Sequence, residues 1–364
     1  MRKKSSTTIY DIAAELKISP ATVSRVLSNS DHPVKEDVRE AVLQAAKKMN
    51  YIPNAQARSL KLKKTSVVGV AIPSISNPFY PSIVRGMEDA AAEEGFFLYL
   101  CSCDRNQGRT AHYIQNMLEQ NVDAIISVYN DTVYDSLSDY VSNGGILINL
   151  NVMNDDFAYD GVYNIQVDKL LEARMATEHL LSLGHKKIAL LMSKVDCQLR
   201  RDKIAGVRQT MEDAGLELPD ERLFIYGRDC PVNESCRDDT ERGIQLVNAM
   251  LERCPDVTAI ICMNDIMAMG TIFQLKKRGY RVPRDYSVMG YDDNFISPYS
   301  SPTISTVALD KYSWGQSLMR FALARIKENR DKKAQIMPTG IIPEGALLKP
   351  ITLIRRESTD VPRL

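Results

Sequence analysis

From Ser66 onward the chain repeats one pattern, in which a short apolar run rich in β-branched residues is followed by an amphipathic stretch of helical length. Continuous apolar runs of this kind are typical of strands buried on both faces, and helices between them favour parallel βαβ units. There are too many runs for a single sheet, so the pattern predicts two Rossmann-like α/β lobes. The predicted strands lie in SVVGVAI, FFLYLC, VDAIISV, GGILINL, KKIALLM, RLFIYG, VTAIICM and YSVMGY.

The first 52 residues follow a different pattern, with three short segments of helical periodicity. TIYDIAAELK begins with Thr8 as a candidate N-cap, and a second helix is expected from Pro20 to about Ser28. The stretch VKEDVREAVLQAAKKMNY predicts a third helix with one apolar face. Two short helices joined by a tight turn and closed by a third describe a helix-turn-helix, although a plain helical subdomain has the same pattern.

The formal net charge of zero conceals an asymmetry between the two parts of the chain. Residues 1–64 carry thirteen Lys and Arg against six Asp and Glu, whereas residues 65–364 carry thirty-three against forty. A basic small domain beside an acidic body predicts a polyanionic partner for the first part only. In a helix-turn-helix the second helix enters the DNA major groove, where Thr22 and Ser24 suit phosphates and Arg25 can reach a guanine edge.

Several other classes of protein are not expected from this sequence. No run approaches the roughly 18 apolar residues of a membrane span, and no apolar segment follows MRKKSSTT, so we expect a cytoplasmic protein without a membrane partner. The pairs Cys101/Cys103 and Cys230/Cys236 are either redox sensors or unremarkable thiols, without metal-ligand spacing. Because GxGxxG, GxxxxGK[ST], GxSxG and HExxH are all absent, we expect no enzyme, no metal and no cofactor.

A series of motifs in a fixed order resembles the LacI/GalR family of bacterial transcription regulators. The motifs are TTIYDIAAELKISPATVSRVLS, NYIPNAQARSL, VVGVAIPSISNPFY, LLSLGHKKIALL, NDIMAMG and RVPRDYSVMGYDD, and together they span nearly the whole chain. The resemblance implies a helix-turn-helix domain over 1–52 and a hinge helix over 53–64. It also implies a core like that of periplasmic binding proteins, with lobe 1 over 65–165 and 311–338 and lobe 2 over 166–310 and 339–364.

The resemblance further implies a sequence-specific regulator, expected to be a repressor, that binds pseudo-palindromic operator DNA as a homodimer. Leu60 of the ARSL motif would wedge into a minor-groove base step, whereas the residue alone indicates only a core or linker leucine. Among the DNA-binding residues, Arg25 is the one expected to make most of the hydrogen bonds to base edges. Lys17 stands where the family often has glycine, at a cost of roughly 1 kcal/mol if the turn needs a positive φ. The expected DNA-binding residues are Thr8, Tyr10, Ser19, Pro20, Ala21, Thr22, Ser24, Arg25, Asn29, Asn54, Ala57, Leu60 and Lys61.

Ligands in such folds lie in the crevice beyond the carboxyl ends of the strands, where polar residues follow several predicted strands. Asn264 is equally suited to capping a helix, and Asp292 to ending a strand. Lys203 replaces the arginine that the family usually presents, and with the nearby Arg200 and Arg201 it indicates either an anionic effector or a solvated helix face. The resemblance implies a small-molecule effector, a sugar or sugar derivative. The expected effector-binding residues are Asn77, Phe79, Tyr80, Asp168, Arg201, Lys203, Asn264 and Asp292.

One alternative function stays open beside a ligand-controlled DNA-binding protein. Two Rossmann-like lobes also occur in solute-binding and sugar-processing proteins, and the basic N-terminal segment would then be an accessory domain. The basic segment with its helical periodicity favours the DNA-binding interpretation, because a transport protein has no need of residues 1–64.

Overall fold

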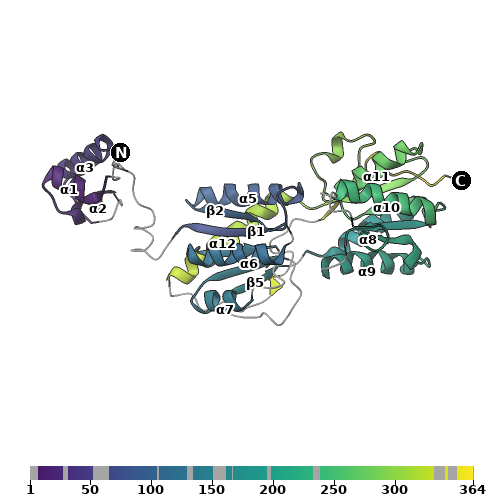
Figure 1. The fold of residues 1–364 in the computed structure, drawn as a ribbon, viewed down its shortest axis with the longest axis horizontal. Helices are drawn as coiled ribbons and strands as arrows, with labels where there is room; N and C mark the ends of the chain where they lie inside the picture. Colours follow the sequence, from purple (N-terminus) through teal and green to yellow (C-terminus); the bar gives the residue numbers. More distant parts are fainter. Residues whose placement is uncertain are drawn as a thin grey trace. The chain divides into compact units, whose positions relative to one another are not determined.

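The computed structural model divides into two compact units, Met1–Thr65 and Ser66–Leu364, which are described separately below (Figure 1). The residues that it describes are 7–27, 32–51, 65–104, 106–128, 134–150, 161–165, 167–194, 198–232, 238–331, 341–342 and 351–363.

The N-terminal unit packs the helices α1 (Ile9–Leu16), α2 (Pro20–Leu27) and α3 (Glu36–Lys48) around a small apolar core. A capping box begins α1, in which the side chains of Thr8 and Asp11 each accept a hydrogen bond from the other residue's backbone N–H. Lys17 ends α1 with a φ of 56°, so this turn does require the left-handed conformation in which lysine costs roughly 1 kcal/mol. The buried core residues are Ile12, Ala13, Val23, Val26, Val42, Ala45 and Ala46.

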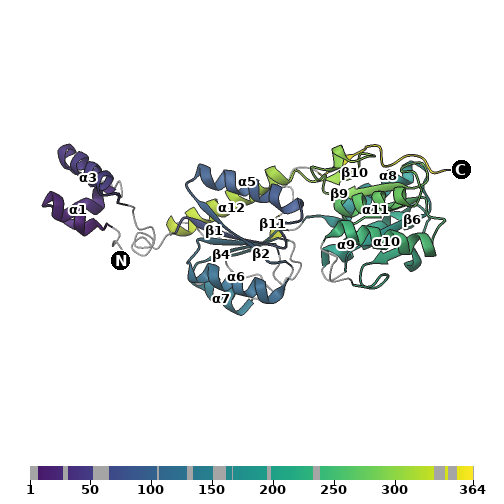
Figure 2. The same ribbon diagram turned by 45° about the horizontal axis from the view of Figure 1, so that its top comes forward.

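The first lobe of the larger unit is a parallel six-stranded sheet in the order β11-β5-β4-β3-β1-β2. Helices α5 (Phe79–Glu93) and α12 (Lys311–Asp331) cover one face, and α6 (Gln107–Glu119) and α7 (Tyr134–Ser142) cover the other (Figure 2). Two apolar cores result, one on each face. The strands are β1 (Val67–Ile72), β2 (Phe97–Ser102), β3 (Ala124–Ser127), β4 (Ile146–Leu150), β5 (Val162–Ile165) and β11 (Ile341–Ile342).

The second lobe is a six-stranded sheet in the order β12-β10-β9-β8-β6-β7, parallel except for the antiparallel pairing of β12 with β10. Its helices form two packed pairs, α8 (Lys169–Ser182) with α9 (Gln198–Asp213), and α10 (Asp239–Arg253) with α11 (Asp265–Lys277). The strands are β6 (Ile188–Met192), β7 (Leu223–Ile225), β8 (Ala259–Cys262), β9 (Ser287–Tyr291), β10 (Ser305–Ala308) and β12 (Thr352–Ile354), and the 3₁₀ turns are η2 (Asp220–Arg222) and η3 (Ser297–Tyr299).

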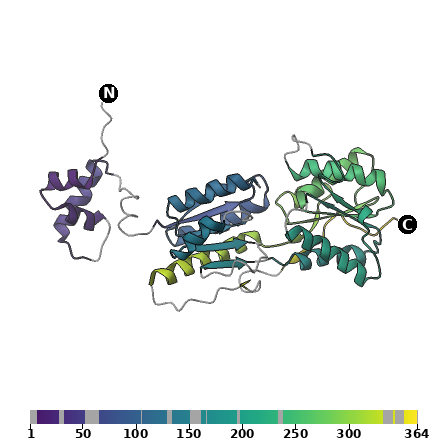
Figure 3. The ribbon, with the colours of Figure 1, turned by 60° about the horizontal axis from the view of Figure 1, so that its bottom comes forward.

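These two sheets confirm the predicted two-lobed α/β fold, with all eight predicted runs forming strands. The chain crosses between the lobes after β5, after β10 and after β11. Figure 3 shows α12, in yellow-green, packed against the blue first lobe, although this helix follows the green second lobe in sequence. One boundary was predicted too early: β11 pairs with β5 in the first sheet, so the chain returns to the second lobe after residue 342 and not at 339.

Reciprocal glycine contacts hold one helix pair in each lobe. A Cβ atom on Gly86 of α5 or on Gly315 of α12 would lie 2.1 Å or 2.0 Å from a carbonyl oxygen of the opposite helix. The same arrangement joins α10 and α11 through Gly243 and Gly270, at 2.3 Å and 2.0 Å. Such distances leave no room for any side chain, so these four glycines set how closely the helices approach.

A buried carboxylate organises the edge of the second sheet. Asp265, at the start of α11, accepts hydrogen bonds through Oδ2 from the backbone N–H of Asn294 (2.8 Å) and the hydroxyl of Ser297 (2.7 Å). Its Oδ1 accepts from the hydroxyl of Thr306 (2.8 Å), and a Cβ on Gly290 would lie 2.1 Å from the same oxygen. One side chain therefore ties α11 to the loop after β9 and to β10.

Burial, with a further contribution from the Asp292 carboxylate, raises the pKa of Asp265 to about 7. The unfolded chain releases this proton near pH 4, so the group's contribution to stability is complete below that pH and falls as the pH rises to about 7. Asp265→Asn is isosteric and does not titrate. We expect the free energy of unfolding of the wild type, minus that of Asp265→Asn, to fall by roughly 2–4 kcal/mol between these pH values.

Urea denaturation followed by circular dichroism at a series of pH values measures this difference. Thr306→Val is the matched control, because it removes one donor but keeps the carboxyl group, and it should retain the wild-type direction of pH dependence. A difference between wild type and Asp265→Asn that stays constant or rises with pH would show that Asp265 is ionised throughout.

Candidate nucleic-acid interface and ligand cleft

Helix α2 presents the polar side chains that the sequence singled out. Ser19 caps it by accepting a hydrogen bond from the backbone N–H of Thr22 (3.1 Å), and the two hydroxyls are hydrogen-bonded to each other (2.9 Å). Val23 and Val26 point into the core, which turns the other faces of this short helix outward. The exposed or half-buried residues on those faces are Pro20, Ala21, Thr22, Ser24 and Arg25.

The start of α1 contributes two more of the predicted DNA-binding residues. Thr8 is exposed at the N-cap, and Tyr10 is 68% exposed, which is unusual for a side chain of its size. The structure thus places eight of the thirteen predicted residues at accessible or partly accessible positions on α1, α2 and their caps. The other five, Asn29, Asn54, Ala57, Leu60 and Lys61, lie outside the described residues.

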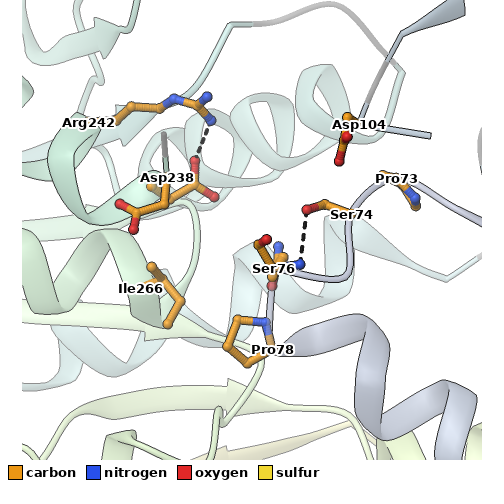
Figure 4. Close-up of a pocket in the computed structure, with 10 residues that line it drawn as sticks. Pro73, Ser74, Ser76, Pro78, Asp104, Asp238, Arg242 and Ile266 are labelled. Atoms are coloured by element: carbon orange, nitrogen blue, oxygen red, sulfur yellow. Dashed lines mark hydrogen bonds and ion pairs between the residues drawn. The ribbon is translucent and has the colours of Figure 1, made fainter. Parts of the chain in front are cut away.

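A cavity of about 250 Å³ is bounded by segments of both lobes (Figure 4). The first lobe contributes the loop after β1, from Pro73 to Pro78, together with Asp104 after β2. The second lobe contributes the first turns of α10 and α11. Of the predicted effector-binding residues, Asn77 lines this cavity, and its Oδ1 accepts a hydrogen bond from the backbone N–H of Phe79 (3.0 Å). The lining side chains of the second lobe are Asp238, Asp239, Arg242 and Ile266.

Asp239 is the centre of a hydrogen-bond network behind this wall. Its buried carboxylate accepts from the hydroxyl of Ser193 (2.9 Å), from Arg242 (2.7 Å) and from the side-chain amide of Asn264 (2.7 Å). Asn264 also caps α11 by accepting from the backbone N–H of Met267 (2.9 Å). Asn264 therefore acts both as a helix cap and as a support for Asp239. Sequence reasoning missed Asp239 and Arg242, whose only signal was an acidic pair at a helix start.

Lys203 is buried and has three partners on its own lobe. Its ammonium lies 3.5 Å from Glu172 Oε2, donates to the carbonyl of Met263 (3.1 Å) and lies 3.5 Å from the ring centroid of Tyr291. Burial lowers the pKa of Lys203, against the opposing effect of Glu172. Burial disfavours the Glu172 carboxylate as well, yet Lys169, at 2.6 Å, and Lys203 together hold the pKa of Glu172 below its usual value.

The three cations near the start of α9 do not converge. Arg201 is exposed and donates to the side chain of Gln198 (2.8 Å), and Arg200 donates to the backbone carbonyl of Lys194. Lys203 alone is buried among partners. Sequence reasoning also missed Lys169 and Glu172, for which the only available signal was their opposite charge at a spacing of three residues on α8.

The remaining predicted effector-binding residues lie at element ends. Asp292 follows β9 with a φ of 96°, and burial raises the pKa of its carboxyl against the opposing effect of nearby lysines. Phe79 and Tyr80 begin α5, with ring centroids 5.2 Å apart in an edge-to-face arrangement against the first-lobe core. Asp168 is exposed and caps α8 by accepting from the backbone N–H of Leu171 (2.8 Å).

Within the described ranges, no three His, Cys, Asp or Glu side chains gather where they could hold a metal ion. No helix formed by these residues is long and apolar enough to cross a membrane. Cys101 and Cys103 are buried free thiols, and burial raises the pKa of Cys101 to about 11, whereas Cys236 lies outside the described residues.

Comparison with known proteins accounts for both parts of the chain. Residues 8–54 match the model of bacterial regulatory proteins of the lacI family, and residues 65–336 match that of periplasmic binding proteins and the sugar binding domain of the LacI family. The HTH-type transcriptional repressor PurR of Haemophilus influenzae is 30% identical over 356 residues, covering 95% of this chain and 99% of PurR. The HTH-type transcriptional regulator RegA of Clostridium saccharobutylicum is 31% identical over 356 residues, covering 97% and 99%.

Among solved structures, the Lac repressor dimer bound to operator and the anti-inducer ONPF superposes with a TM-score of 0.79 at 25% identity. That likeness covers 98% of this chain and 99% of the repressor chain. Family models therefore match most of the sequence, in the order helix-turn-helix and then two-lobed core. The chain belongs to the LacI family and is a DNA-binding transcriptional regulator.

Proposed function

We propose that the chain is a repressor whose affinity for a pseudo-palindromic operator is controlled by a small carbohydrate-derived metabolite bound between the lobes. The observation that carries this proposal is a cavity bounded by both lobes in a chain that also has a helix-turn-helix unit. A ligand that contacts both walls binds best at one angle between the lobes. Ligand and operator are then coupled reciprocally, typically by about 1–3 kcal/mol.

The chemistry of the cavity wall suits a hydroxyl-rich ligand. Serine hydroxyls, the Asn77 amide, the carboxylates of Asp238 and Asp239 and the Arg242 guanidinium offer both donors and acceptors, beside the apolar Ile266. Sugars present the complementary hydroxyl groups, and the family model that matches the core is described as sugar binding.

The way in which the cations of the second lobe are already partnered or exposed favours a neutral ligand over an anionic one. Lys203 has Glu172, a carbonyl and an aromatic ring as partners, and Arg201 is exposed on the outside of α9. Recruiting Lys203 to an anion would leave Glu172 with Lys169 alone in a buried site, which is costly. We therefore infer that hydrogen bonding, and not a net positive charge, selects the effector.

For the DNA-binding face, we predict that Arg25→Ala weakens binding to the duplex selected by the wild type from a random pool by about 10- to 100-fold. A bidentate contact from arginine to guanine contributes roughly 1–3 kcal/mol of discrimination, whereas the phosphate contacts remain. Binding to an unrelated duplex should weaken less than about threefold, since only one charge is removed. Fluorescence anisotropy at fixed salt measures both affinities.

The matched control is Arg39→Ala, which removes the same charge from α3 and should affect both duplexes equally. If Arg25→Ala lost affinity equally for the selected and the unrelated duplex, Arg25 would contact the phosphate backbone and not a base. Failure of the wild type to select any motif, both alone and with added carbohydrate metabolites, would contradict sequence-specific DNA binding.

We also propose that the chain is a homodimer, through an apolar groove on the second lobe. Phe273, Phe295 and Tyr299 are 56%, 72% and 84% exposed. Phe273 and Tyr299 line a groove of about 470 Å³ on α11 and η3, together with Met269 and other apolar side chains. Large exposed aromatic side chains at one place are typical of an interface. A second copy is the partner that we assign, because the similar Lac repressor structure is a dimer.

Replacing Phe273 tests this assignment. We predict that Phe273→Asp raises the dimer dissociation constant at least about tenfold, because it puts a charge where an apolar side chain is desolvated. Sedimentation equilibrium measures the constant. Val232→Asp is the matched control at another exposed apolar position of the same lobe, and should leave it unchanged. An unchanged constant in Phe273→Asp would exclude this groove as the dimer interface.

A further inference from the structure

A lysine of the first lobe is hydrogen-bonded to the loop that follows β9 in the second lobe. Lys311 is the first residue of α12, the helix that packs through the buried Trp314 into the first-lobe core. Its own side chain is only 9% exposed. The ammonium donates to the carbonyl oxygen of Asp292 and to that of Asp293 (3.0 Å), in the loop that follows β9. This contact joins the two lobes in addition to the three segments of chain that cross between them.

The loop that accepts these bonds has a backbone that needs external support. Asp292 and Asp293 have φ values of 96° and 46°, in the left-handed region that costs a non-glycine residue about 1–2 kcal/mol. Four anchors come from the second lobe itself. Arg356 binds the Asp293 carboxylate (2.6 Å), and Asp265 accepts from the Asn294 N–H. The N–H groups of Asp292 and Asp293 donate to β10, at the Val307 carbonyl (2.9 Å) and the Thr306 hydroxyl (3.3 Å). Lys311 supplies the anchor from the first lobe.

The ammonium contacts backbone carbonyls, so the contact depends on the backbone conformation of the loop. The direction of a peptide carbonyl is set by the φ and ψ of the residues beside it, so the bonds from Lys311 in this geometry depend on the left-handed conformation of Asp292 and Asp293. The same conformation determines where the Asp292 side chain points. A movement of α12 relative to β9 therefore changes the support of this loop, and a change in the loop changes its hold on α12.

We propose that Lys311 is a positioning residue that fixes the backbone of Asp292 and Asp293 after β9 and couples the conformation of this loop to the angle between the lobes. The part of this inference that concerns DNA rests on the function proposed above. In this proposal Lys311 transmits a change in the angle between the lobes to the loop after β9. This role differs from ligand contact, because the ammonium binds backbone carbonyls of the second lobe.

Hydrogen exchange of the full-length protein, without DNA or added ligand, tests the positioning role. Lys311→Met keeps the buried stem and removes the ammonium. The backbone N–H groups of Asp292 and Asn294 are hydrogen-bonded, to Val307 and to Asp265, so their exchange reports on the loop. We expect their exchange to accelerate at least tenfold in Lys311→Met, with no change in the central strands β1 and β8.

Two further variants keep this test decisive. Lys327→Met, on the exposed face of α12 and paired with Glu94, is the matched control and should leave the loop unchanged. Lys311→Gln can still donate one hydrogen bond, and should give intermediate exchange even if Lys311→Met proves unstable. Loop exchange at the wild-type rate in both Lys311 variants, or equal acceleration in Lys327→Met, would overturn the positioning role.

Operator affinity then tests the coupling. On the duplex selected by the wild type, Lys311→Met should change the affinity at least threefold relative to Lys327→Met. Accelerated loop exchange with unchanged operator affinity would overturn the coupling to lobe angle. If the wild type selects no duplex, the proposed function fails, while the exchange result still decides whether Lys311 positions the loop.

Discussion

The buried carboxylate of Asp265 accepts three hydrogen bonds, two from the loop that follows β9 and one from β10, and so ties both to α11, whose next residue, Ile266, lines the cavity. Without these bonds the left-handed backbone at Asp292 would lose its support from α11. Lys203 is buried in the same lobe against Glu172, which also binds Lys169, and these opposite charges stabilise one another because an unpaired buried charge costs several kcal/mol. Internal polar contacts therefore make the second-lobe wall rigid before any ligand arrives.

This rigidity has a consequence for the function of the protein as a regulator. In the function proposed above, a wall held by internal bonds does not adapt to its ligand, and the binding energy is then available to change the angle between the lobes. Glycine-packed helix pairs in both lobes, at Gly86 with Gly315 and at Gly243 with Gly270, keep each lobe a single body during such a change. The bonds from Lys311 to the loop after β9 then lie where the two bodies meet.

The sequence predicted the fold well because strands buried on both faces need continuous apolar runs. It missed β5, β10 and β12, whose short segments VYNI, STVA and TLI mix polar and apolar residues. It also missed β11, which has two residues, and so it placed the last lobe crossing too early. The individual cleft residues were suggested by strand ends. Their partners were not, since no local pattern shows that Lys203 meets Glu172, or that Asn264 supports Asp239.

Reciprocal coupling between ligand and operator is the central claim, and one measurement tests it most directly. A carbohydrate ligand is first identified by its effect on the melting temperature in a panel of monosaccharides and their derivatives. Its dissociation constant is then measured by calorimetry on the full-length protein, alone and saturated with the selected duplex. We predict that the two constants differ by about 5- to 150-fold. Equal constants would contradict ligand control of DNA binding.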